Sequence, residues 1–362
     1  MKVAVLWNNL TGYLNSCLRA LADIPGTELF VAHQSSRPEA LFAEAAFSWI
    51  AQRYCYPDQP DAAELVEALR RFKPDVLIVC GWQRPEYRFA CRQMPESCLR
   101  VCTMDNYWHG TPRQWLGVLT ARWFLHPLFD AAFVAGERQA VFARKLGFSV
   151  GQIWRGLYSC DLPAFAAVRQ SHPQSGARRT FIYVGRFVEV KGIDVLAQSY
   201  RTYYERVKEP WPLIVVGAGP LGSLLKGLPG VVFHDFIQPE LLPLMFAQAG
   251  CLLLPSRVEP WGVVIHEATA AGLPVICTDI CGAAVHLVQD GYNGYLIPAE
   301  NAPALTEAMM KFSELSDERR RQMEEGSAAL SQQFSPRRWA NCVYERASGM
   351  LPLKMKKPAA LR

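Results

Sequence analysis

Short apolar runs rich in Val, Ile, Leu and Phe recur along the chain, and stretches with helical spacing separate them. The runs are continuous rather than alternating, which is typical of parallel strands covered on both faces. We expect strands at 3–7, 29–33, 76–80, 101–104, 132–135, 153–155, 181–184, 213–216, 231–233, 251–254, 275–278 and 295–297. Helical patterns between them include 14–22, 62–72, 192–207 and 302–312. This alternation predicts an α/β fold with doubly wound parallel sheets.

One polar stretch, residues 168–179, contains Pro and Gly and interrupts the alternation. We expect it to link two Rossmann-like domains, residues 1–167 and 180–335, and to serve as the hinge on which they close. Ligands in such sheets bind beyond the carboxyl ends of the strands, so the two domains are expected to face a cleft. Ser335 followed by Pro336 predicts a helix start. We expect this last helix, 336–350, to pack back toward the amino-terminal domain.

Composition narrows the class of protein. The chain has 362 residues and a formal net charge of +5, which is too weak to argue for nucleic-acid binding. No stretch is apolar enough to span a membrane, and the first strand is too short for a signal peptide, so we expect a cytoplasmic protein. The eleven cysteines show no metal-ligand spacing and are expected to be reduced, mostly buried thiols. Residues 351–362 form a basic tail that could add weak attraction to anionic lipid.

Two segments after predicted strands could hold phosphate. Arg186 follows Gly185 at the end of one strand, and Lys191 lies at the entry to the next helix. Two cations and a helix N-terminus at one place suit a diphosphate, although charged loop residues are common. A small-residue turn at Gly217–Pro220 allows close approach of a ligand or another backbone, but it lacks the spacing of a dinucleotide fingerprint.

A third segment carries more information. The run 255–262, PSRVEPWG, follows a strand and leads into a helix that contains Glu267. Glu259 lies in the loop, and Gly262 leaves backbone N–H groups free at the helix start. Each carboxylate can accept two hydrogen bonds from a vicinal diol, so the segment outlines a site for a nucleotide sugar. The alternative is that Glu259 caps the helix and Glu267 is an ordinary helical residue.

The motifs of the carboxyl-terminal half resemble those of the family 4 glycosyltransferases, which have the GT-B fold. The resemblance rests on YVGRFVEVKGIDVLAQSY, on VVGAGP and on the long run from PSRVEPWG to DGYNGYLI, within residues 180–297. In particular, the ExxxxxxxE pattern matches at Glu259 and Glu267, and the VGR…KG pattern matches at Arg186 and Lys191. The amino-terminal half resembles the family only in topology and in faint features such as GLYSCD at 156–161.

The resemblance implies a role for each matching residue. Arg186 and Lys191 would bind the donor diphosphate and stabilise the leaving group, while Glu259 would contact the transferred sugar. These three are the expected catalytic residues. The expected donor-binding residues are Gly12, Gly185, Gly217, Trp261, Gly262, Val263 and Glu267, with Glu267 on the ribose. The family generally retains anomeric configuration and generally needs no metal, so we expect no cofactor.

The amino-terminal domain departs from the family at one position. Where the family often has a histidine at the end of the fourth strand, the nearest residue here is Asp105, and His109 follows four residues later. Either side chain could line the cleft. The segment Trp115–Phe133 is rich in Trp, Phe and Leu, and its helical spacing favours a core segment. An exposed apolar face beside Arg113 and Arg122 would instead suit a membrane surface or a lipid-linked acceptor.

The expected function is transfer of a hexose from a nucleotide diphosphate sugar to a carbohydrate or lipid-linked acceptor, with retention, in polysaccharide or glycolipid assembly. Peripheral contact with the inner face of the membrane would fit such an acceptor. Two alternatives stay open at this point. One is a GT-B epimerase or phosphorylase acting on a sugar nucleotide or sugar phosphate. The other is a catalytically silent subunit that binds a nucleotide sugar.

Overall fold

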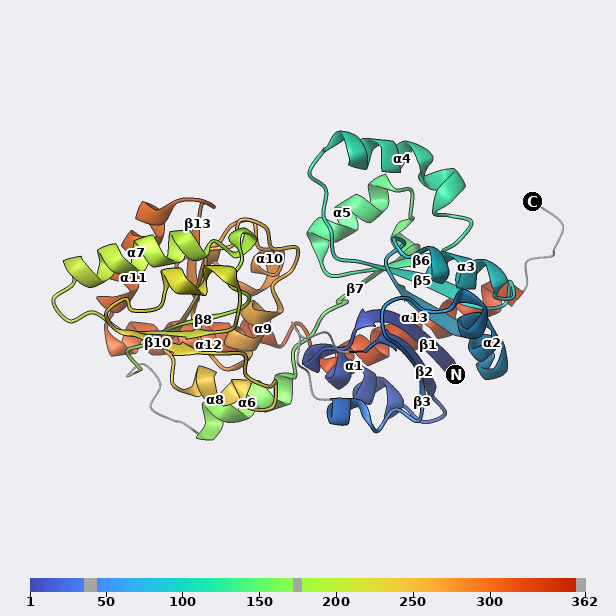
Figure 1. The fold of residues 1–362 in the computed structure, drawn as a ribbon, viewed down its shortest axis with the longest axis horizontal. Helices are drawn as coiled ribbons and strands as arrows, with labels where there is room; N and C mark the ends of the chain where they lie inside the picture. Colours follow the sequence, from blue (N-terminus) through green and yellow to red (C-terminus); the bar gives the residue numbers. More distant parts are fainter. Residues whose placement is uncertain (36–43, 172–177, 356–362) are drawn as a thin grey trace. The chain divides into compact units, whose positions relative to one another are not determined.

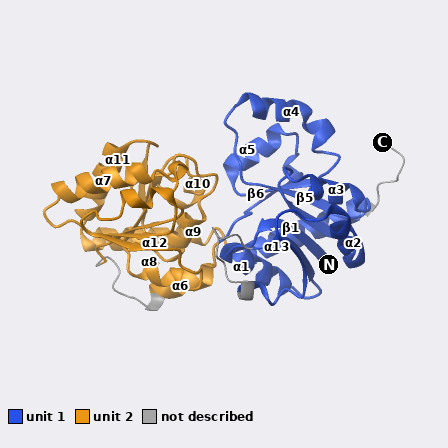
Figure 2. Cartoon of the chain, viewed as in Figure 1, with its two compact units in different colours: residues 1–159, 335–362 blue, residues 160–334 orange. Residues whose placement is uncertain are grey.

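The computed structural model describes residues 1–35, 44–171 and 178–355, and the chain divides into two compact units. The first unit comprises residues 1–159 and 335–362, and the second comprises residues 160–334 (Figure 2). Each unit has a parallel β-sheet with helices connecting its strands (Figure 1). The predicted fold class, two Rossmann-like α/β domains, is therefore confirmed.

The sheet of the first unit has the strand order β3-β2-β1-β4-β5-β6-β7. Its strands are β1 (Lys2–Asn9), β2 (Glu28–Gln34), β3 (Gln52–Tyr56), β4 (Val76–Cys80), β5 (Leu99–Met104), β6 (Ala131–Val134) and β7 (Ile153–Arg155). Strand β3 was not expected, because it lies at the sheet edge and exposes Gln52, Arg53 and Cys55 instead of forming an apolar run. The chain order reverses between β1 and β4, which makes their carboxyl ends the switch point of this sheet.

The α-helices of the first unit are α1 (Gly12–Ala22), α2 (Ala62–Phe72), α3 (Pro85–Gln93), α4 (Pro112–Phe124), α5 (Glu137–Lys145) and α13 (Pro336–Met355). Helix α13 packs against α1 in this unit, and its Trp339 Nε1 donates to the Leu157 carbonyl over 2.9 Å. The helix continues beyond residue 350, so Lys354 is helical and forms an ion pair with Asp130 instead of belonging to a solvated tail. Residues 356–362 of the expected basic tail lie outside the described part of the chain.

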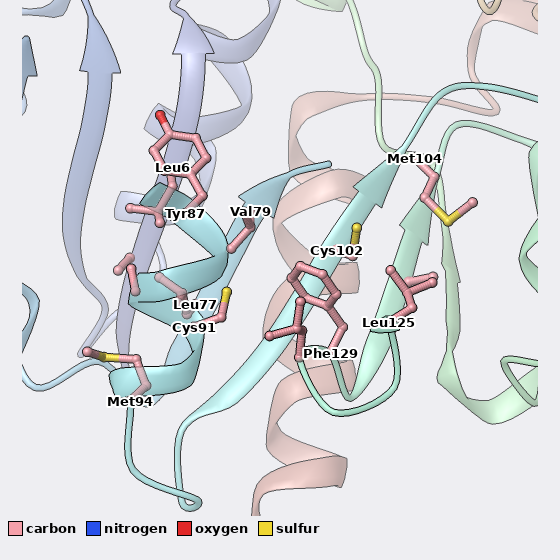
Figure 3. Packing of buried hydrophobic residues seen from close by; sticks show 14 of the residues in the cluster. Leu6, Leu77, Val79, Tyr87, Cys91, Met94, Cys102, Met104, Leu125 and Phe129 are labelled. Carbon is pink, nitrogen blue, oxygen red and sulfur yellow. The ribbon is translucent and has the colours of Figure 1, made fainter. Parts of the chain in front are cut away.

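The core of the first unit lies between its sheet and the helices. Leu77 and Val79 of β4 lie next to Tyr87 and Cys91 of α3, and Cys102 of β5 lies next to Phe129, as Figure 3 shows. Continuous burial on both faces explains why these strands carry uninterrupted apolar runs.

Helix α4 corrects one expectation. The segment Trp115–Phe133 was expected to be core, but only its second half is buried, including Leu125 and Phe129 (Figure 3). Within α4 itself Ala121 is the buried residue, whereas Trp115, Leu119 and Trp123 are 52%, 67% and 73% exposed. Helical spacing identifies one apolar face, but it cannot tell whether a neighbour covers that face.

The sheet of the second unit has the order β10-β9-β8-β11-β12-β13. Its strands are β8 (Phe181–Val184), β9 (Leu213–Val216), β10 (Val231–His234), β11 (Cys251–Leu254), β12 (Val275–Thr278) and β13 (Gly294–Ile297). The α-helices are α6 (Leu162–Ser171), α7 (Ile193–Arg206), α8 (Leu242–Ala247), α9 (Val263–Ala270), α10 (Ala284–Leu287), α11 (Ala302–Ser313) and α12 (Asp317–Ser331). Here the order reverses between β8 and β11.

The boundary between the units differs from the expected linker. Helix α6 packs against α8 and α9, and the Phe165 and Phe246 rings lie 5.5 Å apart. The apolar side chains of α6 therefore belong to the second core, and the division falls at Ser159 and Cys160 instead of at residues 168–179. Within that expected linker, residues 172–177 lie outside the described part of the chain.

Candidate functional site

The candidate site of the second unit is built on the loops that follow β8 and β11, the two strands at its switch point. Ligands of open parallel sheets bind beyond the carboxyl ends of such strands. The loop after β8 contains Arg186 and Lys191, and the loop after β11 contains Glu259. The structure thus brings the three expected catalytic residues to the same end of one sheet.

Lys191 and Glu259 form a direct ion pair between Nζ and Oε2. The two side chains are 17% and 8% exposed, so the pair is largely removed from water. Ser256, which the sequence analysis did not single out, also donates to the Glu259 carboxylate, over 3.3 Å. The Val190 carbonyl accepts from the N–H of Arg257 over 2.9 Å, which ties the two loops together through the main chain.

Arg186 belongs to the same loop as Lys191 but does not join this pair. Its side chain is exposed, and within the described residues its guanidinium has no hydrogen-bond or ion-pair partner. Its carbonyl accepts a 3.1 Å hydrogen bond from the Tyr183 hydroxyl. Burial, reinforced by the Glu259 charge, raises the pKa of Tyr183 and keeps this hydroxyl protonated. Tyr183, a further residue absent from the sequence-based site, therefore holds the Arg186 backbone in place.

Gly217 illustrates why this site needs small residues. Its φ is 144°, and a Cβ placed on it would lie 2.0 Å from the Gly185 carbonyl oxygen. The loops after β8 and β9 therefore meet backbone to backbone, which is reinforced by a 2.8 Å bond from Phe187 N–H to the Ala218 carbonyl. Gly185 and Gly217, both expected to bind donor, have this close approach as their evident local role.

Gly262 precedes helix α9 in a left-handed conformation with φ of 92°. Within the described chain, the N–H groups of Gly262 and Val263 have no acceptor, so the partial positive charge of the helix start is unopposed there. The Trp261 side chain points the other way. It is 3% exposed and packs edge-on against Phe334 at 5.3 Å, which leaves its backbone as the part that a ligand can reach.

Glu267 lies one turn further along α9. Val263, Val264 and Glu267 are the partly exposed residues of this helix and share one face, while its other residues are buried. The Glu267 carboxylate has no hydrogen-bond or ion-pair partner among the described residues, and burial raises its pKa to about 7. A carboxylate held in this way gains hydrogen bonds when a ligand supplies hydroxyl donors.

His266, which the sequence analysis did not single out, fixes α9 from its opposite side. Its Nδ1 accepts from the Cys160 N–H over 3.0 Å, and its Nε2 donates to the Ser331 carbonyl over 3.0 Å. This arrangement needs the neutral ring, and burial lowers the pKa of His266 to about 4. His266 stands beside Glu267 in the sequence, so the family motif marked the place but not this role.

The first unit carries its expected residues on separate loops. Gly12 is the first residue of α1, directly after β1, and Asp105 directly follows β5. The Asp105 carboxylate accepts a 3.2 Å hydrogen bond from the Tyr158 hydroxyl, and the Tyr13 and Tyr158 rings meet edge to face at 5.4 Å. Tyr158 lies within GLYSCD, the segment that the sequence analysis named only as a faint resemblance.

His109 is exposed on the loop between β5 and α4, where its ring lies 4.2 Å from that of Tyr107. It lines a pocket of about 690 Å³ in this unit. The pocket is also lined by Trp82, Arg88, Arg113, Leu116 and Phe124, whereas Asp105 does not line it. The two candidate residues of the first unit thus belong to different local environments.

The chemical content of the second-unit site is clear from these contacts. It offers an exposed cation, a paired cation, free N–H groups and two carboxylates, which together match the groups of a sugar nucleotide. Of the residues that the structure describes, no group of three or more His, Cys, Asp and Glu side chains could hold a metal ion.

Comparison with known proteins shows what this site is similar to. The model described as "Glycosyl transferases group 1" matches residues 165–329, which contain the whole candidate site of the second unit. A GDP-mannose-dependent alpha-mannosyltransferase of Corynebacterium glutamicum is 30% identical over 70% of this chain and 63% of its own. A GDP-mannose-dependent alpha-(1-6)-phosphatidylinositol monomannoside mannosyltransferase of Mycobacterium tuberculosis is 29% identical over 64% of this chain and 65% of its own. The chain spans 26–63% of the length of the first five curated relatives that it matches.

Among solved structures, HepE of Anabaena in complex with UDP and glucose has a TM-score of 0.72 to this chain. The match covers 96% of this chain and 99% of HepE at 16% identity, which compares the fold alone. The structural neighbours are GT-B proteins, as the two Rossmann-like units predict. With the family model over residues 165–329 and the curated relatives, this fold makes the chain similar to the family 4 glycosyltransferases of GT-B architecture.

Proposed function

We propose that this chain transfers a hexosyl group from a nucleoside diphosphate sugar to an acceptor hydroxyl, with retention of anomeric configuration. The observation that supports this most is the group of charges at the switch point of the second sheet. There the Lys191–Glu259 pair, the unpartnered Arg186 and the free N–H groups before α9 lie on loops after β8 and β11.

The proposed roles follow from the charges. The donor diphosphate would bind Arg186, Lys191 and the N–H groups of Gly262 and Val263, whose positive charge stabilises the departing nucleoside diphosphate. As Lys191 turns to the phosphates, the Glu259 carboxylate would be released to accept hydrogen bonds from the sugar. Glu267 would accept from the two ribose hydroxyls.

The names of the relatives narrow the donor. Two of them use GDP-mannose, and HepE holds UDP and glucose, so we propose a guanine or uracil nucleotide carrying a hexose. We further propose an acceptor that is a carbohydrate or a lipid-linked sugar, and a role in surface polysaccharide or glycolipid assembly in the cytoplasm. No metal cofactor is proposed, because the described cations and N–H groups can take the phosphate charge.

Donor binding is tested first by thermal unfolding with UDP, GDP, ADP and their common sugars, on the wild type and on Glu267→Ala. A ligand at a hundred times its dissociation constant adds about 2.7 kcal/mol of stability. We expect one nucleotide to stabilise the wild type but not Glu267→Ala. Glu240→Ala, which removes an exposed carboxylate of the same unit, should respond like the wild type.

The outcomes separate the alternatives. If no nucleotide stabilises the wild type against thermal unfolding, the donor site is contradicted and a catalytically silent subunit is favoured. Donor consumption without transfer to any acceptor would favour an epimerase or phosphorylase. Once a donor is known, activity that survives dialysis against EDTA would support metal independence, and the anomeric coupling constant of the product by NMR would test retention.

A further inference from the structure

The outer face of α4 is an apolar stripe that is largely exposed, although the Trp108 ring meets that of Trp115 edge to face at 5.1 Å. At 3.6 residues per turn, Leu119 and Trp123 lie at the centre of this face, with Trp115 and Leu116 beside them. Their exposed fractions of 67%, 73%, 52% and 62% agree with this placement. Figure 1 shows α4 at the periphery of the first unit. We call these four side chains the α4 stripe.

Cations border the α4 stripe on both sides. The same helical geometry puts Arg122 at one edge and Arg113 toward the other, and both are exposed. The Lys145 amino group lies 5.8 Å from the Trp115 ring centroid, and the Arg88 guanidinium lies 5.4 Å from that of Phe124. Between Asn106 and Phe129 the chain has no Asp or Glu at all. The surface around the stripe is therefore apolar at its centre and positive at its rim.

We propose that α4 lies flat in the surface of an anionic lipid bilayer and docks the first unit on it. An interfacial helix buries an apolar face rich in Trp and Leu at the headgroup boundary, while Arg and Lys at its edges bind lipid phosphates. Helix α4 has 13 residues, fewer than the roughly 20 needed to span a bilayer, so it lies on the surface. Within the described residues, no helix of the chain is long and apolar enough to cross a membrane.

Charge argues against a second copy of the chain as the occupant of this face. A symmetric dimer brings the same patch against itself, so Arg113 and Arg122 of one copy would meet those of the other. Because the segment supplies no carboxylate, like charges would face each other across such an interface. An anionic headgroup layer instead supplies the opposite charge along the whole rim.

The pocket of the first unit shares Arg113 and Leu116 with this face. Docking by α4 would therefore bring the mouth of the pocket to the headgroup layer, where the polar end of a lipid-linked acceptor lies. This last step depends on the proposed function, whereas docking itself does not.

Co-sedimentation with vesicles tests the docking. We expect the wild type to bind vesicles of phosphatidylcholine with phosphatidylglycerol, and Leu119→Glu/Trp123→Glu to lose that binding. Leu241→Glu/Leu244→Glu changes two exposed leucines of the second unit and should bind like the wild type. Arg113→Ala/Arg122→Ala should lose about thirty-fold on anionic vesicles, at about tenfold per 1.4 kcal/mol, and little on phosphatidylcholine alone.

Two results would overturn the proposal. One is equal vesicle binding by the wild type and Leu119→Glu/Trp123→Glu, or binding by neither. The other is a wild-type dimer in sedimentation velocity without lipid that Leu119→Glu/Trp123→Glu converts to monomer, which would make the face a protein interface. An unchanged melting temperature of the variants checks folding. Vesicle binding needs no donor, so it can succeed or fail independently of glycosyl transfer.

Discussion

The loops at the carboxyl end of the second sheet and those at the same end of the first sheet are held in different ways. In the second unit, main-chain contacts join neighbouring loops, such as Arg257 N–H to the Val190 carbonyl at 2.9 Å and the Gly217–Gly185 approach, alongside the Lys191–Glu259 pair. In the first unit, the contacts that involve the expected residues and their neighbours are made by side chains. Arg84 Nε donates to Asn8 Oδ1 over 2.6 Å, and Tyr158 donates to Asp105.

This difference explains which half of the chain is recognisable from sequence. A close approach of two backbones admits only glycine, and a free helix start needs a particular turn. These requirements therefore restrict the residue types at the positions concerned. Hydrogen bonds between side chains can be made by many pairs of residue types. A donor site built on the main chain is therefore visible as a motif, while the other half can change its residues and keep its fold.

The largest expected effect is on catalysis in the second unit. Lys191→Ala should lower kcat by about two to three decades, because it removes a cation from the developing diphosphate charge. The control is Lys208→Ala, which removes an exposed lysine from the loop before β9, at the other end of the sheet. It should change kcat by less than about threefold. His109→Ala in the first unit should cost less than tenfold. Steady-state kinetics with the identified donor would measure all three, and a Lys191→Ala enzyme of normal kcat would contradict the assignment.

The next effect tests the role of main-chain packing directly. Gly217→Ala should lower the free energy of unfolding of the second unit by about 3 kcal/mol, because its Cβ would collide with the Gly185 carbonyl. Gly227 also has a positive φ, but a Cβ added there would meet open space. Gly227→Ala therefore measures the loss of stability that comes from the backbone conformation alone. Asn8→Ala, which removes one side-chain bond in the first unit, should cost about 1 kcal/mol. Urea unfolding would rank the three, and equal losses for Gly217→Ala and Asn8→Ala would remove the distinction.

His266 predicts acid sensitivity confined to the second unit. Its pKa falls from the ordinary 6.5 to about 4 on folding, so the unfolded chain takes up the proton first as pH falls. Stability from this group is complete above pH 6.5 and is lost toward pH 4, by about 2 kcal/mol between pH 7 and pH 5. Hydrogen exchange of α9 peptides would measure it. His266→Gln can keep both hydrogen bonds and should abolish this slope, whereas His109→Gln should leave it unchanged.

Glu267 predicts a pH dependence of the opposite sign. Folding raises its pKa from 4.5 to about 7, so the ionised carboxylate destabilises the free protein as pH rises through that interval. Glu267→Gln should therefore stabilise the protein by about 3 kcal/mol at pH 8 and by less than about 1 kcal/mol at pH 5. The same variant should lose nucleotide-induced stabilisation. A variant that is more stable when free but no longer binds is typical of a residue that serves binding and lowers stability. Destabilisation at pH 8 would show that the carboxylate already has a favourable partner.

Much of the fold could be predicted because buried parallel strands need continuous apolar runs, and each expected strand is present. Strand β3 was not predicted, because a strand at the edge of a sheet tolerates polar residues such as Gln52 and Arg53. The motif loops also placed Arg186, Lys191 and Glu259 at one end of the second sheet. Their expected roles stay predictions, as does the choice between Asp105 and His109.

The sequence by itself determined the alternation of strands and helices and the glycine-bearing loops, because local geometry and burial act on neighbouring residues. Tertiary structure alone decided that α6 joins the second core, that Lys191 pairs with Glu259, and that the α4 stripe is exposed. Each of these depends on which surface a distant segment covers. A chain pattern specifies that a face is apolar or that a charge is present, but the partner is set only when the whole chain has packed.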